Sequence, residues 1–213
     1  MRSILFCGGG FLLRLEIGFI PHKWISDIPD ACGYFPFAIE GETENIVDFT
    51  FSGNCNVEEF VSNWMNEINH FPIYIFVEVC DYNQKEFEQD CQTYNIEFVR
   101  AKFGFYKAII ENCRQFSVIF PYVYASGGMN DVALWSLKRD VFRLEKRDIN
   151  TIWGIKKLHI PVVTLLKNDC VFWVSFDAAS LFAISNGSQF STITKISEKL
   201  PPKTHFIISE YEE

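Results

Sequence analysis

Three consecutive glycines, Gly8 to Gly10, are the first residues that could do chemistry, because glycine-rich loops cradle phosphate groups. Such a loop leads from a strand into a helix, whose N-terminus holds the phosphate. Here the residues from Leu13 to Ile17 alternate between apolar and charged, which is typical of a strand. The glycines also lack the G-x-G-x-x-G spacing, and no Lys-Ser or Lys-Thr follows them. The stretch therefore predicts a β-hairpin, plain or bulged, and no phosphate site.

Histidines and cysteines show no catalytic or metal-binding spacing. The four histidines are far apart in the sequence, and the seven cysteines include no C-x-x-C pair. No G-x-S-x-G, H-E-x-x-H or S-x-x-K motif is present. Glu78, Asp81, Glu86 and Asp90 could bind Mg²⁺ or Ca²⁺, but we expect them to be solvated surface residues. The sequence predicts no metal and no cofactor, and its unpaired thiols suit a reducing cytoplasm.

A second glycine motif, YASGGMND at residues 124–131, is a candidate site. Gly127 and Gly128 permit a sharp turn or the close approach of another backbone. Asn130 and Asp131 place side-chain oxygens beside them, and loops carry functional sites more often than core strands do. The alternative interpretation is an Asx-stabilised turn between two strands.

Charge is distributed unevenly along the chain. Residues 40–97 contain thirteen acidic residues and one basic residue, a balance of −12. Residues 98–160 contain eleven basic and five acidic residues, a balance of +6. The two segments could pack together and neutralise each other in part, or the acidic one could attract a basic partner.

The overall charge and hydropathy exclude two classes of partner. The net charge of −8 argues against general nucleic-acid binding. No run of residues approaches the roughly 20 apolar residues of a membrane-spanning helix, so we expect no membrane association.

The clearest predicted helix begins after Asn56. Asn56 and Glu59 have the spacing of a capping box. Apolar residues from Val57 to Ile68 then recur on one helical face. Residues 73–80 follow as an apolar run, which predicts a central strand covered on both faces.

The other predicted elements are strands with shorter helices between them. We expect strands at 46–51, 97–102, 116–124 and 205–209, and an acidic helix at 83–94. The spacing of apolar residues from Phe105 to Cys113 predicts a further helix. Two hairpins are expected, one joining 132–137 to 141–146 and one joining 162–166 to 170–176. The prolines between residues 21 and 37 indicate a structured loop.

Together these elements predict an α+β fold. Its sheet is mixed or mainly antiparallel, and two or three helices are inserted between residues 56 and 114. No internal repeat or linker is visible, so a single globular domain, 1–213, is expected.

The first functional hypothesis is a non-enzymatic binding or inhibitory protein that presents its acidic segment, residues 40–97, to a basic protein. An immunity protein that guards a cell against a basic nuclease toxin is one concrete version. Such carboxylates would speed association and fix the register more than they set affinity. The residues expected to make the contact are Glu58, Glu59, Glu67, Asp81, Glu86, Glu88 and Asp90.

The second hypothesis is a small hydrolytic enzyme with a site built from loops. Asp131 would act as base or ligand, with His159 or His205 as its partner. This hypothesis requires at least two of these side chains to lie within hydrogen-bond reach of each other in a concave pocket.

Overall fold

The computed structural model describes residues 14–24, 35–53, 56–151 and 153–211. The glycine turn and first strand of the hairpin predicted at residues 4–18 lie outside the described residues. So does the middle of the loop predicted between residues 21 and 37. The strand predicted after the glycines is present as β1, Arg14–Phe19.

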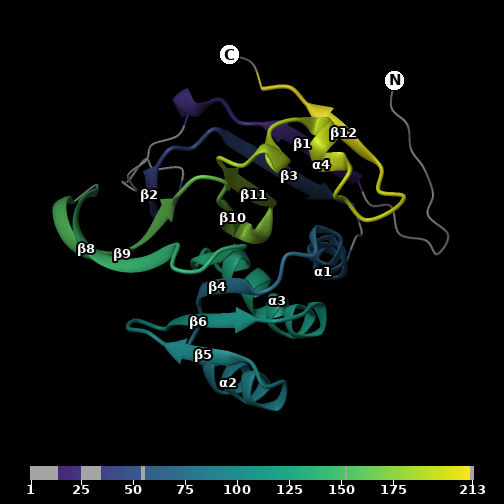
Figure 1. Ribbon diagram of the computed structural model, residues 1–213. Helices are drawn as coiled ribbons and strands as arrows, with labels where there is room; N and C mark the ends of the chain where they lie inside the picture. Colours follow the sequence, from purple (N-terminus) through teal and green to yellow (C-terminus); the bar gives the residue numbers. More distant parts are fainter. Residues whose placement is uncertain (1–13, 25–34, 54–55, 152, 212–213) are drawn as a thin grey trace.

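Within the described residues, nine strands form one mixed sheet (Figure 1). Their order is β12-β1-β3-β11-β10-β7-β4-β6-β5, and only the β1–β12 pair is parallel. Besides β1, the strands are β3 (Asn45–Ser52), β4 (Ile73–Glu78), β5 (Glu97–Arg100), β6 (Phe105–Ile110), β7 (Ala133–Ser136), β10 (Cys170–Val174), β11 (Ser180–Ser185) and β12 (Phe206–Ser209).

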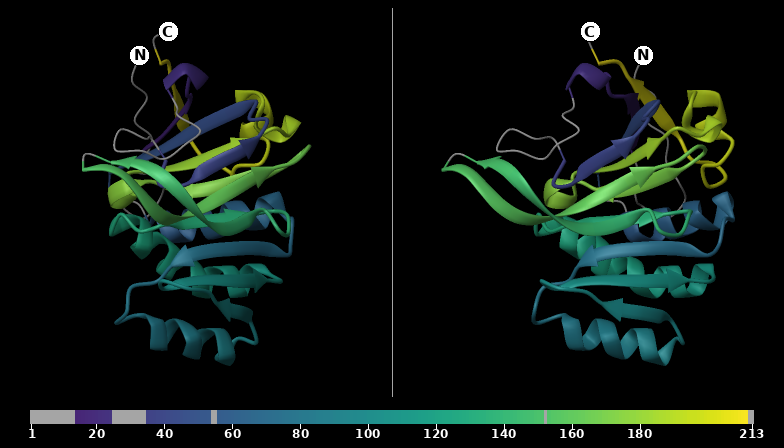
Figure 2. Two further views of the ribbon diagram at one scale, coloured as in Figure 1. Left: turned by 90° about the vertical axis from the view of Figure 1, so that its left-hand side faces the viewer. Right: turned by 60° about the vertical axis from the view of Figure 1, so that its left-hand side comes forward.

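A second, three-stranded sheet covers part of one face of the large sheet (Figure 2). It consists of β2 (Ala38–Gly41), β9 (Gly154–Leu165) and β8 (Phe142–Thr151), in that order. β2 pairs with β9 in parallel, and β8 pairs with β9 as a long antiparallel hairpin. Phe142, Val163 and Leu165 pack from this sheet onto Phe76 and Trp173 of the large sheet.

Helices cover the opposite face of the nine-stranded sheet (Figure 1). α3 (Cys113–Gly128) packs between α1 (Val57–Ile68) and α2 (Gln84–Thr93) and contacts both. The short helix α4 (Ile193–Ser197) also packs on this face through Ile196. Side chains alternate across the pleated sheet, so the large sheet has an apolar core on each face. None of the helices in the described residues has the length and hydrophobicity needed to cross a bilayer.

The α+β prediction is confirmed, and so are several of its elements. The side chain of Asn56 accepts a hydrogen bond from the Glu59 backbone N–H, which caps α1 where the sequence places the helix start. β4 is buried on both faces, since Ile75 packs in the core beneath the helices and Phe76 in the core on the other face. α2 also lies in the predicted range.

Two neighbouring predictions were wrong: the segment predicted as a helix is a strand, and the segment predicted as a strand is a helix. Residues 105–110 form the strand β6, because Tyr106 and Phe105 are buried in the cores on opposite faces of the sheet. Residues 116–124 belong to α3, although Pro121 lies inside that helix. Helices α1 and α2 therefore lie between residues 56 and 114, whereas β6 replaces the helix predicted from Phe105 to Cys113. The third long helix among the described residues, α3, was not predicted.

Both predicted hairpins of the C-terminal half were also wrong. β7 pairs with β10 and β4, and β8 pairs with β9 in the other sheet. β10 pairs with β11 and β7, and it makes no ladder with β9. The KRD and KND turns each connect a strand of one sheet to a strand of the other. The connected strands pack across the core between the two sheets instead of pairing as hairpins.

Candidate functional site

The predicted acidic contact residues lie in two regions, on α1 and at or just before α2, with α3 packed between these two helices. Glu58, Glu59 and Glu67 belong to α1, and Asp81 precedes α2. Helix α3 lies between the two helices and carries no carboxylate. Helix axes pack at roughly 8–10 Å, so the predicted contact residues form two separate patches. The remaining three, in α2, are Glu86, Glu88 and Asp90.

Two of the α2 carboxylates are engaged within the molecule. The hydroxyl of Tyr106 donates to Glu88 over 2.6 Å, and Arg100 lies 3.6 Å from the same carboxylate. Burial and this carboxylate raise the pKa of Tyr106 to about 12. The hydroxyl of Tyr122 donates to Asp90 over 2.7 Å. Glu88 and Asp90 therefore attach α2 to the sheet and to α3, which leaves them less free for a partner.

A further ion-pair group joins the acidic and basic segments on the other side of the molecule. Arg143 and Arg147 of β8 both pair with Glu40 of β2 and with Glu145. The two segments thus neutralise each other in part, and Glu40 is not available as a free acidic group. The carboxylates of α1 are not neutralised in this way, because Glu58, Glu59 and Glu67 make no ion pair among the described residues.

A third acidic group surrounds the C-terminal end of α3. We call Asp81, Tyr82, Met129, Asn130, Asp131 and Asp177 the acidic patch. The Tyr82 hydroxyl donates to the Met129 sulfur over 3.4 Å, which links the start of α2 to the end of α3. Asn130 accepts from the Asp177 backbone N–H over 2.7 Å, and its amide lies 3.3 Å from the Asp177 carboxylate. Three segments distant in sequence therefore converge here.

The glycines of the YASGGMND motif determine how this end of α3 is positioned. Gly127 packs directly against β10, where a Cβ atom would lie 2.3 Å from Val174 Cγ1. The close backbone approach that the sequence allowed is therefore present, but it occurs in a helix. The alternative of an Asx turn between two strands was wrong, because residues 124–128 are helical. Asn130 follows with a φ of 65°, the left-handed conformation that ends the helix.

The electrostatics of the acidic patch are dominated by carboxylates. Asp131 is partly buried, and burial raises its pKa. Burial, followed by the negative charge of Asp131, raises the pKa of the neighbouring Glu78. Among the described residues, Glu78, Asp81, Asp131 and Asp177 make no ion pair. The C-terminal end of a helix adds a partial negative charge to the same place.

The apolar part of the acidic patch is exposed. Tyr82 has 74% of its surface accessible and Met129 has 43%. The sequence analysis identified Asp81, Asn130 and Asp131 as candidates, but it did not identify Met129 or Asp177. Asp177 lies in a short 3-10 turn (Phe176–Ala178), where its backbone has a left-handed φ of 57°. This conformation is a property of the structure that sequence pattern does not reveal.

The structure does not bring Asp131 to either histidine proposed as its partner. His159 lies in β9, where its ring packs 4.7 Å from that of Phe103. His205 directly precedes β12, five strand spacings from β7, or about 24 Å at roughly 4.8 Å per spacing. The part of the chain that the structure describes holds no hydrogen bond between Asp131 and a histidine. It also holds no group of three or more His, Cys, Asp or Glu side chains that could bind a metal.

Comparison with known proteins gives no assignment. The chain matches no protein-family model, no curated protein and no solved structure.

Proposed function

We propose that the chain is a non-enzymatic binding protein whose acidic surface engages a basic protein partner. The observation that carries this proposal is the separation of charge by layer. α1, α2 and α3 together carry six carboxylates and two basic residues. On the other side of the large sheet, β8 and β9 carry five basic and two acidic residues. The helical layer therefore presents a negative potential that attracts positively charged partners.

The acidic patch is the part of this layer best suited to be the centre of an interface. Protein interfaces combine a desolvated aromatic or Met centre with a polar rim. Tyr82 and Met129 supply that centre, and Asp81, Asp131 and Asp177 supply the rim. The α1 carboxylates and Glu86 lie further out, where charges act mainly on the rate of association.

An immunity-type inhibitor of a basic nuclease toxin is the concrete form of this proposal. Such a partner carries Lys and Arg side chains for nucleic-acid phosphates, and these pair equally well with carboxylates. Cys80, Cys91, Cys113 and Cys170 are free thiols, which supports a reducing, cytoplasmic location.

The test begins with capture of partners on the immobilised chain from its native lysate at 50 mM and 500 mM NaCl, followed by mass spectrometry. We expect a basic protein that is lost at high salt. Its affinity is then measured for the variant Asp81→Asn/Asp131→Asn/Asp177→Asn over a salt series. Removing three rim charges should weaken binding about 10- to 100-fold at low salt and flatten the salt dependence.

The matched control neutralises three exposed carboxylates elsewhere, as Glu42→Gln/Glu44→Gln/Glu198→Gln, and it should retain the affinity of the parent chain. Tyr82→Ala tests the apolar centre separately and should accelerate dissociation more than it slows association. Equal affinities and equal salt slopes for the patch variant and the control would refute the proposal.

A further inference from the structure

The hairpin formed by β8 and β9 extends beyond the rest of its sheet (Figure 2). β2 pairs with β9 only at residues 162–165. Along residues 154–161, the one strand partner of β9 in the described part of the chain is β8. This two-stranded ribbon is about 26 Å long, at roughly 3.3 Å per residue for eight residues. A two-stranded ribbon alone is marginally stable in water, so a covered ribbon is the more stable arrangement.

Large apolar side chains are concentrated on and beside the ribbon. Trp153 is 79% exposed at its tip and Ile155 is 76% exposed. Val99 of β5 and Phe103 of the β5–β6 turn are exposed to 60% and 59%. With Leu158, they are five of the eleven large hydrophobic side chains that are exposed in the described residues. Exposed apolar groups gathered in one region indicate an interaction surface.

The ribbon contacts the turn between β5 and β6. The pairing register places Ile155 and His159 on the same face of β9, and the ring of His159 packs against Phe103. Lys107 of β6 donates a hydrogen bond to the Phe142 carbonyl at the start of β8, over 2.7 Å. The β5–β6 region of the large sheet therefore contacts both the ribbon, through Phe103, and the start of β8, through Lys107.

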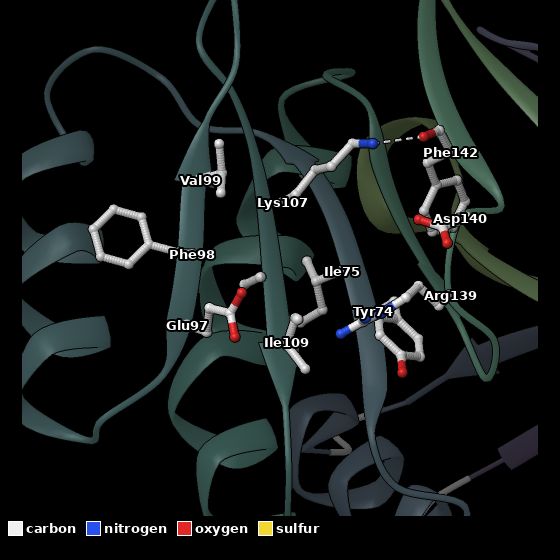
Figure 3. Close-up of a pocket in the computed structure, with 11 residues that line it drawn as sticks. Tyr74, Ile75, Glu97, Phe98, Val99, Lys107, Ile109, Arg139, Asp140 and Phe142 are labelled. Atoms are coloured by element: carbon white, nitrogen blue, oxygen red, sulfur yellow. Dashed lines mark hydrogen bonds between the residues drawn. The ribbon is translucent and has the colours of Figure 1, made fainter.

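A pocket of about 150 Å³ lies on the large sheet beside the start of β8, where Phe142 of the small sheet forms part of its lining (Figure 3). Tyr74 and Ile109 line it from β4 and β6, beside Val99. Arg139 lies over the ring of Tyr74, with its guanidinium carbon 5.8 Å from the ring centroid, and it makes no ion pair among the described residues. We call the pocket together with Phe103, Trp153, Ile155 and His159 the ribbon surface.

The charges around the ribbon surface have both signs. Lys107, Arg139, Lys146 and Lys157 are basic, whereas Glu97, Asp140 and Asp148 are acidic. A nucleic acid or an anionic membrane would meet the three carboxylates and the net charge of −8. In a two-fold symmetric contact, residues away from the axis meet different residues of the other copy, so a rim of both charges can be self-complementary.

We propose that the ribbon surface joins two copies of this chain in a symmetric dimer. Each ribbon covers the apolar groups of the other copy, and its Trp153 and Ile155 are buried at the contact. Homodimer interfaces are apolar at their centre and rich in aromatic residues, as this surface is. The acidic patch contributes no residue to it, so the inference does not depend on the proposed function.

Sedimentation velocity of the full chain at 1–200 μM in 150 mM NaCl tests the dimer. We expect the mass to rise with concentration from 24.7 kDa to twice that value. Trp153→Ser/Ile155→Ser should weaken the dimer at least tenfold. Both side chains are exposed in the single chain, so the melting temperature of the dilute variant should stay close to that of the parent chain.

Leu166→Ser is the matched control, because Leu166 is 68% exposed in the turn between β9 and β10 and lies outside the ribbon surface. It should leave the dimer unchanged. Val99→Ser, on the sheet instead of the ribbon, should also weaken the dimer and provides a second test if the double variant misfolds. A monomer at every concentration, or a dimer insensitive to both ribbon-surface variants, overturns the proposal.

Discussion

The carboxylates of Glu78 and Asp131 repel each other at the edge of the acidic patch. Burial raises the pKa of both carboxyls, and Asp131 raises that of Glu78 further. The folded chain therefore binds these protons more tightly than the unfolded chain does. Above the folded pKa both carboxyls are ionised, and their full destabilisation of the folded state is present. As the pH falls from the folded pKa to the unfolded pKa, the folded chain takes up protons and this destabilisation is lost.

Glu78→Gln should consequently raise the melting temperature at pH 7, because it removes a half-buried charge that faces Asp131. The gain should shrink as the pH falls and vanish near pH 3, where the parent carboxyl is protonated as well. Thermal denaturation followed by circular dichroism at pH 3, 5 and 7 measures this. Glu44→Gln, in the exposed turn after β2, should show no such dependence. A Glu78→Gln variant that is less stable at pH 7 than at pH 3, relative to the parent chain, contradicts the argument.

The residues of the acidic patch were only partly predictable from the sequence. Asn130 and Asp131 were identified because glycines and side-chain oxygens adjoin them. Their meeting with Asp81 and Asp177 depends on contacts over about 50 residues of chain, for which local pattern carries no information. The internal bonds of Glu88 with Tyr106 and of Asp90 with Tyr122 were unpredictable for the same reason.

At the scale of elements, the two glycines at the end of α3 should respond in opposite ways to alanine. A Cβ on Gly127 would lie 2.3 Å from Val174 Cγ1 and 3.2 Å from the Val174 carbonyl oxygen, so the helix must shift away from β10. Gly127→Ala should cost about 1–3 kcal/mol in the free energy of unfolding. A Cβ on Gly128 meets only Ala178 at 3.8 Å, and Gly128→Ala should stabilise by about 0.4–1 kcal/mol.

Denaturant unfolding of both variants beside the parent chain measures these changes. Since the two residues are adjacent and the substitution is identical, helix propensity affects both alike. The difference in sign depends on the contact with β10. Equal effects of the two substitutions would mean that α3 does not pack on β10 through Gly127.

The exchange of helix and strand between residues 105 and 124 has a physical origin. Both segments are short apolar runs, and a strand buried on both faces cannot be told from a buried helix by periodicity. Pro121 favoured a strand edge, because proline inside a helix removes a hydrogen bond. Phe116, Ile119, Phe120 and Val123 are nevertheless all buried along one face of α3. Tertiary burial therefore outweighs the local penalty of the proline.

At the scale of the whole molecule, charge asymmetry along the sequence becomes asymmetry between layers. The acidic segment supplies α1 and α2 on one face of the large sheet, and the basic segment supplies β8 on the other. The sequence predicted the charge balance and the α+β class. It could not predict which side each segment would occupy, since that depends on the order of strands in the sheet.

The large sheet also makes the two apolar cores depend on each other. β4 supplies Ile75 to the core beneath the helices and Phe76 to the other, and β10 supplies Phe172 and Trp173 in the same way. Loss of either core exposes strands that hold the other. We therefore expect a single calorimetric transition, with equal calorimetric and van't Hoff enthalpies and a heat-capacity change of about 3 kcal/mol/K.

Variants on opposite faces sharpen this test of a single domain. Gly127→Ala disturbs the helical side, and Val163→Ala removes two methyl groups from a fully buried position in the small sheet. Each should lower the midpoint of the same transition, because neither core survives alone. The measurement is made at low micromolar concentration, so that the proposed dimer does not contribute to the midpoint. Two separate transitions, each sensitive to one variant only, would show that the helical side and the small sheet unfold independently.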